Sequence, residues 1–160
     1  MAFKLAPMSE EDFQRFLNKS MQEYAYNQTV AGNWLPQNAV AFAREEQSQM
    51  LPDGLNTPNA FLSNVIDEND QKIGMMWFFL DEERPQKTVV LLDFFLFPLF
   101  RGKGFEADVL KTFEEGIKSI GVKRIELQVF GHKTDEVQMY MENAYKQTMV
   151  LFGKNLAGQI

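Results

Sequence analysis

The stretch from Leu96 to Leu110, LFPLFRGKGFEADVL, decides the fold. It overlaps the end of a nearly continuous apolar run, Thr88 to Phe97, which is typical of a strand buried on both faces. Apolar residues then recur at helical spacing from Phe105 to Ile120. The sequence therefore predicts a buried strand, a glycine-containing loop and a helix, in that order.

The loop in this stretch, Arg101 to Glu106, is a candidate anion site. The start of a helix presents unpaired backbone N–H groups and a partial positive charge, which suits a pyrophosphate. Arg101 and Lys103 add complementary charge, and glycine lets the backbone come close to a ligand. A plain basic turn that leads into a helix has the same residues, so both interpretations stay open.

Working outward, hydrophobic periodicity predicts the other elements. A first strand at Phe3–Leu5 precedes a helix that opens with a capping box of Ser9 and Asp12, and Pro36 starts a second helix that Pro52 ends. The later elements are strands at 61–67, 73–80 and 125–129, a helix at 135–143 and a closing strand at 147–152. Three consecutive strands indicate a mixed sheet, and the strands that flank the central helix should be parallel through a right-handed crossover.

Composition excludes several classes of function. The 160 residues correspond to one domain, 1–160, and a formal net charge of −6 argues against nucleic acid as a partner. The chain has no cysteine and one histidine, which excludes disulfides, thiolate chemistry and multi-histidine metal sites, so we expect no metal. The N-terminus lacks the apolar region of a signal peptide, and the longest apolar run is too short to span a bilayer. We therefore expect a cytoplasmic protein that does not bind membranes.

Arg101 and Gly104 match the pattern Arg/Gln-x-x-Gly-x-Gly/Ala of the acetyl-CoA loop in the GNAT superfamily, the acetyl-CoA-dependent N-acetyltransferases. The resemblance, to a bacterial subgroup, extends over almost the whole chain. It rests on Asn33-Trp34, residues 51–58, Gly74 with Trp77, and residues 121–127 with 129–132.

The resemblance implies an α/β fold with a mixed, mostly antiparallel sheet of about six to seven strands flanked by four helices. It also implies a V-shaped splay between two central parallel strands. We expect Thr88–Phe97 and Arg124–Phe130 to be adjacent and parallel at the loop end and to diverge beyond it.

The same resemblance implies roles for individual residues. It implies that acetyl-CoA is a co-substrate held by three parts of the chain. These are the strand backbone of Phe95, Leu96 and Phe97, the loop residues Arg101, Gly102, Lys103, Gly104, Phe105 and Glu106, and Lys133, which replaces a frequent asparagine. Tyr140 matches a tyrosine that protonates the departing thiolate, although it can equally be a packing residue. Asp93, the only acid in the apolar run, is a candidate base for the substrate ammonium or a carboxylate bonded to neighbouring backbone.

Four positions depart from the family pattern. Glu106 stands where Gly or Ala is expected, Lys133 replaces asparagine, Ala144-Tyr145 replaces Gly-Phe, and Phe95 replaces an acidic or small residue. A carboxylate at 106 repels a pyrophosphate and can itself accept the N–H groups of the helix start.

Two functional hypotheses follow. The first is an N-acetyltransferase that acts on an amine-bearing small molecule or protein by direct attack. The alternative is a catalytically impaired domain of the same fold that serves as a cofactor-binding or protein-interaction module. The apolar last strand, 147–152, can also pair across a homodimer.

Overall fold

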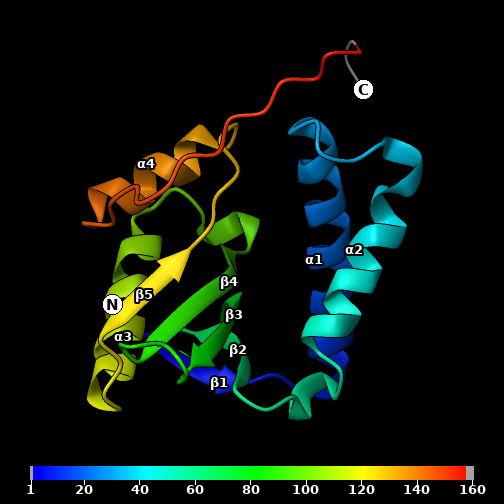
Figure 1. Cartoon of the computed structure of the whole chain (residues 1–160). Coiled ribbons are helices and arrows are strands. Elements are labelled where there is room, and N and C mark those ends of the chain that lie inside the picture. The colour runs from blue at the N-terminus through cyan, green and yellow to red at the C-terminus, as the bar shows by residue number, and fades with distance from the viewer. Residues whose placement is uncertain (1, 158–160) are drawn as a thin grey trace. The chain divides into compact units, whose positions relative to one another are not determined.

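Five strands form one mixed sheet in the order β1-β2-β3-β4-β5 within residues 2–157, the part of the chain that the computed structural model describes (Figure 1). The strands are β1 (Lys4–Pro7), β2 (Ala60–Ile66), β3 (Lys72–Asp81), β4 (Thr88–Leu96) and β5 (Arg124–Leu127). Neighbouring strands are antiparallel from β1 to β4, and β4 and β5 are parallel. The predicted mixed, mostly antiparallel sheet is confirmed.

The helices are α1 (Glu10–Val30), α2 (Pro36–Met50), α3 (Phe105–Ser119) and α4 (Thr134–Glu142). The chain divides into two compact units. One contains the residues up to Phe16 together with Asp53–Gln128, and the other contains Leu17–Pro52 together with the residues from Val129 onward. None of the helices in residues 2–157 combines the length and the apolarity that crossing a membrane requires.

Local signals place the helix starts as predicted. The backbone N–H of Asp12 donates to Ser9 Oγ at 3.1 Å, which confirms the capping interaction at the start of α1. Pro36 lies in the first turn of α2, where its missing N–H costs no intrahelical hydrogen bond. In the second unit, α1 and α2 pack through a small buried cluster. The cluster contains Met21 and Ala25 of α1 and Ala39 and Ala43 of α2, and the small alanines allow close packing.

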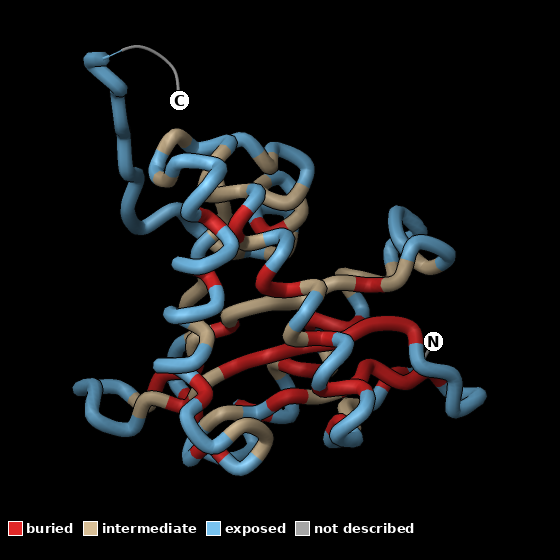
Figure 2. The backbone as a smooth tube through the Cα atoms, turned by 90° about the vertical axis from the view of Figure 1, so that its right-hand side faces the viewer, coloured by how far each residue is buried: buried red, intermediate tan, exposed pale blue. Residues whose placement is uncertain are grey.

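The core of the first unit lies between α3 and the sheet. Buried residues are drawn in red in Figure 2; β2 and β3 are the mostly buried strands, and α3 contributes the buried residues Val109, Leu110, Phe113 and Ile117. Phe113 packs on Phe78 of β3, with ring centroids 4.9 Å apart. The apolar face predicted from Phe105 to Ile120 is therefore the face that α3 buries, except at Ile120, which follows the helix and is 55% exposed.

Two details of the sheet correct the expectations. The segment 147–152 is an exposed coil, so the strand count is five within the described residues and β5 is an edge strand rather than a central one. A strand requires a hydrogen-bonded neighbour as well as apolar residues, and this segment has none in residues 2–157.

The expected pairing of β4 and β5 at the loop end is also wrong. The two strands pair at the opposite end, Thr88–Leu91 with Arg124–Leu127, and the ladder stops before the loop. The strands β4 and β5 are therefore unpaired at the end that leads to the loop.

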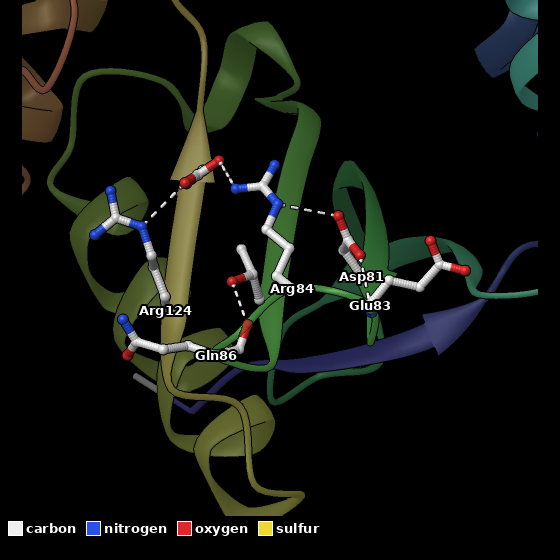
Figure 3. A network of polar contacts seen from close by, with 7 residues as sticks. Asp81, Glu83, Arg84, Gln86 and Arg124 are labelled. Atoms are coloured by element: carbon white, nitrogen blue, oxygen red, sulfur yellow. Dashed lines mark hydrogen bonds and ion pairs between the residues drawn. The ribbon is translucent and has the colours of Figure 1, made fainter.

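Polar contacts hold β5 at the paired end of β4. Figure 3 shows the Arg84 guanidinium between two carboxylates: Nε donates to Asp81 at 3.0 Å and Nη1 donates to Glu126 of β5 at 2.6 Å. Arg124 Nε also donates to Glu126, at 3.0 Å, and the hydrogen bonds from Arg84 and Arg124 lower the pKa of Glu126. Because these groups are partly exposed, they specify the position of β5 more than they stabilise the fold.

A buried carboxylate ties α1 to the sheet. Asp12 is 7% exposed, and its Oδ2 accepts from Lys72 Nζ at 2.6 Å and from Asn64 Nδ2 at 3.0 Å. The hydrogen bond from Lys72 holds the pKa of Asp12 below its ordinary value of 3.8, against the raising effect of burial. A carboxyl group with a lowered folded-state pKa stabilises the fold above its unfolded pKa, and this contribution is lost as the pH falls through the folded value.

We therefore expect Asp12→Asn to lower the free energy of unfolding by about 1–3 kcal/mol at neutral pH. The difference from the unsubstituted protein should shrink as the pH falls from about 4, where Asp12 of the unfolded chain begins to bind a proton, through the lower pKa of Asp12 in the folded protein. Urea unfolding at several pH values measures both effects. Asp70→Asn is the matched control, because Asp70 pairs with Lys4 at the exposed surface; it should change stability little. A pH-independent difference for Asp12→Asn would contradict the ionic role.

Candidate functional site

A β-bulge in β4 shapes the strand before the loop. Trp77 of β3 pairs with Asp93, but the next residue, Phe78, pairs with Leu91, so Leu92 is an extra residue in β4. The last β4–β5 pair, Leu91 with Leu127, falls directly before this bulge. Because a bulge bends its strand and increases the local twist, Leu92 gives a physical reason for the ladder to end there.

The bulge also changes which side chains share a face. Leu91 and Asp93 are two residues apart and would share a face of a regular strand. Leu91 pairs with Phe78, which packs on α3, whereas Asp93 pairs with Trp77, whose ring lies 6.1 Å from Phe16 of α1. Asp93 therefore belongs to the α1 side of the sheet. Phe95 lies on this side too, stacked on Phe16 at 6.3 Å.

Gly74 allows β3 and β4 to approach closely at the loop end. A Cβ atom at this position would lie 2.3 Å from the carbonyl oxygen of Phe95, so no other residue fits without displacing β4. Phe97 N donates to Ile73 O at 2.8 Å, which continues the contact past the last residue of β4. The backbone of Phe95, Leu96 and Phe97 is thereby positioned from the β3 side.

The loop between β4 and α3 depends on two glycines. Gly102 and Gly104 have φ values of 69° and 83°, in the left-handed region that favours glycine. A Cβ atom at either position would meet nothing within 4 Å, so backbone conformation, and not space, requires glycine here. Gly104 precedes the first residue of α3 and supplies no side-chain cap, so the first N–H groups of the helix have no intrahelical acceptor.

Charged side chains in this loop already have partners within the first unit. Arg101 Nε donates to the carbonyl oxygen of Leu96 at 2.6 Å, which links the loop to the end of β4. Glu106 turns back toward the loop, and its Oε1 accepts the backbone N–H of Gly102 at 3.1 Å. Lys103 is exposed, and Phe105 packs on Phe3 with centroids 5.9 Å apart. The structure thus brings together the predicted residues from Phe95 to Glu106.

Tyr140 and Lys133 belong to the second unit, whereas the loop residues belong to the first. Tyr140 is buried and packs edge-on against Tyr145, with centroids 5.4 Å apart. Lys133 Nζ forms an ion pair with Glu136 at 2.9 Å. His132 Nε2 lies 2.9 Å from Asn27 Oδ1, which is consistent with a structural role for this histidine.

The sequence reasoning gave no role to Trp77, although it noted the residue. Trp77 is 6% exposed, lies opposite Asp93, and its indole Nε1 is buried with no hydrogen-bond acceptor in residues 2–157. A tryptophan and an aspartate both occur in the strands, but only the register of the bulge shows that they are neighbours. Within the same residues, no group of three or more His, Cys, Asp or Glu side chains is arranged to hold a metal ion.

Comparison with known proteins agrees with the fold. The sequence profile of the Acetyltransferase (GNAT) family matches residues 18–145. The uncharacterized N-acetyltransferase YdgE of Bacillus subtilis is 31% identical, with 98% of this chain and 99% of YdgE covered. YycN, also from B. subtilis and also named an uncharacterized N-acetyltransferase, is 30% identical, with 98% and 100% covered.

Solved structures give the same result. The crystal structure of YycN superimposes with a TM-score of 0.93 at 29% identity, covering 97% of this chain and 99% of YycN. The PaiA N-acetyltransferase of Thermoplasma acidophilum, solved in complex with coenzyme A, shares the fold, with a TM-score of 0.60, 17% identity and 89% of each chain covered. By sequence profile, relatives and fold, the chain belongs to the GNAT family of acetyltransferases.

Proposed function

We propose that the chain transfers an acetyl group from acetyl-CoA to a primary amine on a small molecule or a protein. The observation that carries this proposal is the loop after β4, where two left-handed glycines lead to a helix start without a side-chain cap. Such a helix start binds phosphate groups through its backbone N–H groups. Membership of an acetyltransferase family supports acetyl-CoA as the phosphate-bearing ligand.

In this proposal, the pyrophosphate accepts hydrogen bonds from the backbone of Arg101–Glu106. Arg101 and Lys103 contribute positive charge, and by the family resemblance Lys133 stands where an asparagine often helps to hold the cofactor. The pantetheine arm runs along the backbone of Phe95–Phe97, where β4 has diverged from β5. The orientation of this backbone toward a ligand depends on the bulge at Leu92 and on the close approach at Gly74.

The chemical step needs three proton transfers, because the substrate ammonium loses one proton before attack, the attacking nitrogen loses a second to solvent as the amide forms, and the thiolate gains one. The neutral amine attacks the thioester carbonyl carbon, a C–N bond forms, and the C–S bond breaks with the electron pair going to sulfur. Asp93 accepts the proton that the substrate ammonium must lose, directly or through water. Tyr140 donates its phenolic proton to the thiolate. The role of Tyr140 follows the family resemblance, and the role of Asp93 is supported by its place as the only acid in the apolar run and by its half-buried position after the bulge.

One observation favours the second candidate function, a catalytically impaired domain that binds a cofactor or a partner protein. The Glu106 carboxylate already accepts the Gly102 N–H, one of the groups that a pyrophosphate would use. Coulomb repulsion between this carboxylate and a phosphate at contact distance is of order a few kcal/mol near a protein surface. Glu106 therefore competes with the ligand by both occupancy and charge.

Calorimetric titration with acetyl-CoA, followed by a thiol-release assay with a panel of primary amines, tests the proposal. Because the chain has no cysteine, a thiol reagent detects only the coenzyme A that is released. We expect binding and amine-dependent release of thiol. Binding without release for any amine would favour the impaired domain, and absence of binding at millimolar acetyl-CoA would overturn the cofactor site.

Glu106→Ala should tighten acetyl-CoA binding at least tenfold, equivalent to roughly 1.4 kcal/mol, because it removes both the competing acceptor and the negative charge. Glu106→Gln retains the size of the side chain and removes only the charge, so its effect should be smaller. The gain should be larger at low salt than at high salt. Equal affinities for all three proteins would show that Glu106 does not compete with the cofactor.

Tyr140→Phe should lower kcat about 100-fold or more while acetyl-CoA affinity changes less than twofold, because a proton donor acts mainly in the transition state. Tyr145→Phe, which removes a hydroxyl from the ring packed against Tyr140, is the matched control and should have little effect on kcat. Steady-state kinetics and calorimetry separate the two quantities. An unchanged kcat for Tyr140→Phe would leave this residue a packing role only.

Asp93→Asn should lower kcat/KM for an alkylamine about 100-fold near pH 7, where the amine is protonated. The deficit should shrink as the pH approaches about 10, because the amine then loses its proton to solvent without help. The pH profiles of the two proteins provide the measurement. A deficit that stays constant with pH would assign Asp93 a role other than general base.

A further inference from the structure

The buried indole N–H of Trp77 is a feature of the first unit that the proposed chemistry leaves unused. Trp77 lies in β3 and is 6% exposed, and its Nε1 atom has no hydrogen-bond acceptor among residues 2–157. Most buried polar atoms in proteins have a partner, because a donor that leaves water without a replacement destabilises the fold. The indole N–H is a donor only, so an acceptor is the group that it needs.

Apolar packing holds the Trp77 ring in place. The ring stands edge-on to Phe16 of α1, with centroids 6.1 Å apart and an interplanar angle of 90°. Phe16 is fully buried and also stacks on Phe95. On the other side, Leu62 of β2 pairs with Trp77 and is 5% exposed. These hydrocarbon neighbours offer the N–H no acceptor, and their close packing opposes rotation of the ring. The acceptor must therefore approach Trp77.

Two side chains on this face of the sheet carry acceptor atoms near Trp77. Asp93 lies directly opposite Trp77 in the ladder between β3 and β4. Directly opposite residues have Cβ atoms about 4.5–5.5 Å apart, within reach of a carboxylate and an indole. Asn64 of β2 pairs with Met75, so it is a diagonal neighbour of Trp77, at about 7–8 Å. Its Oδ1 is also buried, and no donor in the described part of the chain bonds to it.

Charge and freedom to move favour Asp93 over Asn64. The side chain of Asn64 is 3% exposed, and its Nδ2 donates to Asp12 Oδ2 at 3.0 Å, which fixes the amide in a position where Oδ1 does not bond to Trp77. Only an intervening water could join these two groups. Asp93 is half-buried, so its carboxylate has room to turn, and an ionised acceptor makes a stronger hydrogen bond than an amide oxygen.

We propose that the indole N–H of Trp77 donates to the Asp93 carboxylate before that carboxylate receives the proton of the substrate ammonium, so Trp77 is a positioning residue for the base. The proposal rests on the proposed function of Asp93. A carboxylate has about four acceptor sites, so one bond to Trp77 leaves sites for the proton and for other donors. The bond fixes the direction of the carboxylate and favours its ionised form, which a base must have and to which it returns when the proton passes to solvent.

Nuclear magnetic resonance of the Trp77 indole group tests this contact without an assay of activity. The chain has two tryptophans, so the Trp34→Phe protein gives a single indole N–H signal, that of Trp77. If this N–H donates to Asp93, its proton signal should move upfield as the pH falls from about 5 to 3, the usual range for an aspartate. Asp93→Asn in the same protein should abolish the movement.

Asp12 provides the matched control for this titration. It is a second carboxylate that faces the sheet, one helical turn before Phe16 on α1, and it pairs with Lys72 of β3. Asp12→Asn should leave the titration of the Trp77 signal in place. A signal that does not titrate, or a titration that survives Asp93→Asn, would overturn the proposal. The second result would assign the acceptor to another group, such as a water shared with Asn64.

Trp77→Phe tests the consequence for the reaction, because it keeps an aromatic ring against Phe16 and removes the N–H. We expect kcat/KM for an alkylamine to fall at least tenfold near pH 7, and the acid limb of its pH profile to move up by about one pH unit, since Asp93 loses a bond to its ionised form. Acetyl-CoA affinity should change less than twofold, and Trp34→Phe should change none of these quantities.

A purely structural role for Trp77 gives a different result. The loss of kcat/KM would then be the same at every pH, with the acid limb in its original place, and this would overturn the proposal. If the unsubstituted protein acetylates no amine, the proposed function fails, and the titration of the Trp77 signal still decides whether Trp77 contacts Asp93.

Discussion

The extra residue Leu92 in β4 is the constraint on which the rest of the candidate site depends. Before it, β4 pairs with β5 and contributes Leu91 to the face that packs on α3. After it, Asp93 and Phe95 belong to the opposite face, with Trp77 and Phe16. A regular strand would keep Leu91, Asp93 and Phe95 on one face, so the bulge is what separates the structural half of this strand from the half that leads to the loop.

The loop after β4 must start α3 stably and, in the proposed function, must also leave backbone N–H groups available to an anion, and these two requirements conflict. A helix start without a cap is less stable than one whose N–H groups are satisfied, by about 1 kcal/mol per missing cap. The hydrogen bond from the Gly102 N–H to Glu106 joins the loop to the first turn of α3 without capping an N–H group of that turn, and it uses a donor that an anion would also need. In the proposed function, the competing hydrogen bond weakens ligand binding by about 0.5–1.5 kcal/mol, and charge repulsion from the Glu106 carboxylate adds to this effect.

Much of the fold could be predicted from the sequence because its signals are local. The capping pair Ser9 and Asp12, the proline at the start of α2 and the apolar face of α3 each depend on residues within a few turns of one another. The strand count and the paired end of β4 could not be predicted, since they depend on contacts between distant parts of the chain. The apolar residues at 147–152 indicate a strand, but a strand also needs a hydrogen-bonded neighbour, and the local sequence does not state whether one is present. The bulge is equally hidden, because Leu92 looks like any other residue of an apolar run.

The basic residues of the candidate site show that backbone geometry matters more there than side-chain charge. Arg101 Nε is bonded to Leu96 O, and Lys133 is paired with Glu136, so both side chains already hold the structure of their own unit. Lys103 is exposed, where water and salt screen its charge. The N–H groups at the start of α3 are different, because the left-handed conformations of Gly102 and Gly104 orient them before any ligand arrives. In the proposed function, binding at this loop therefore requires little reorganisation of the backbone, and Glu106 is the residue that moves.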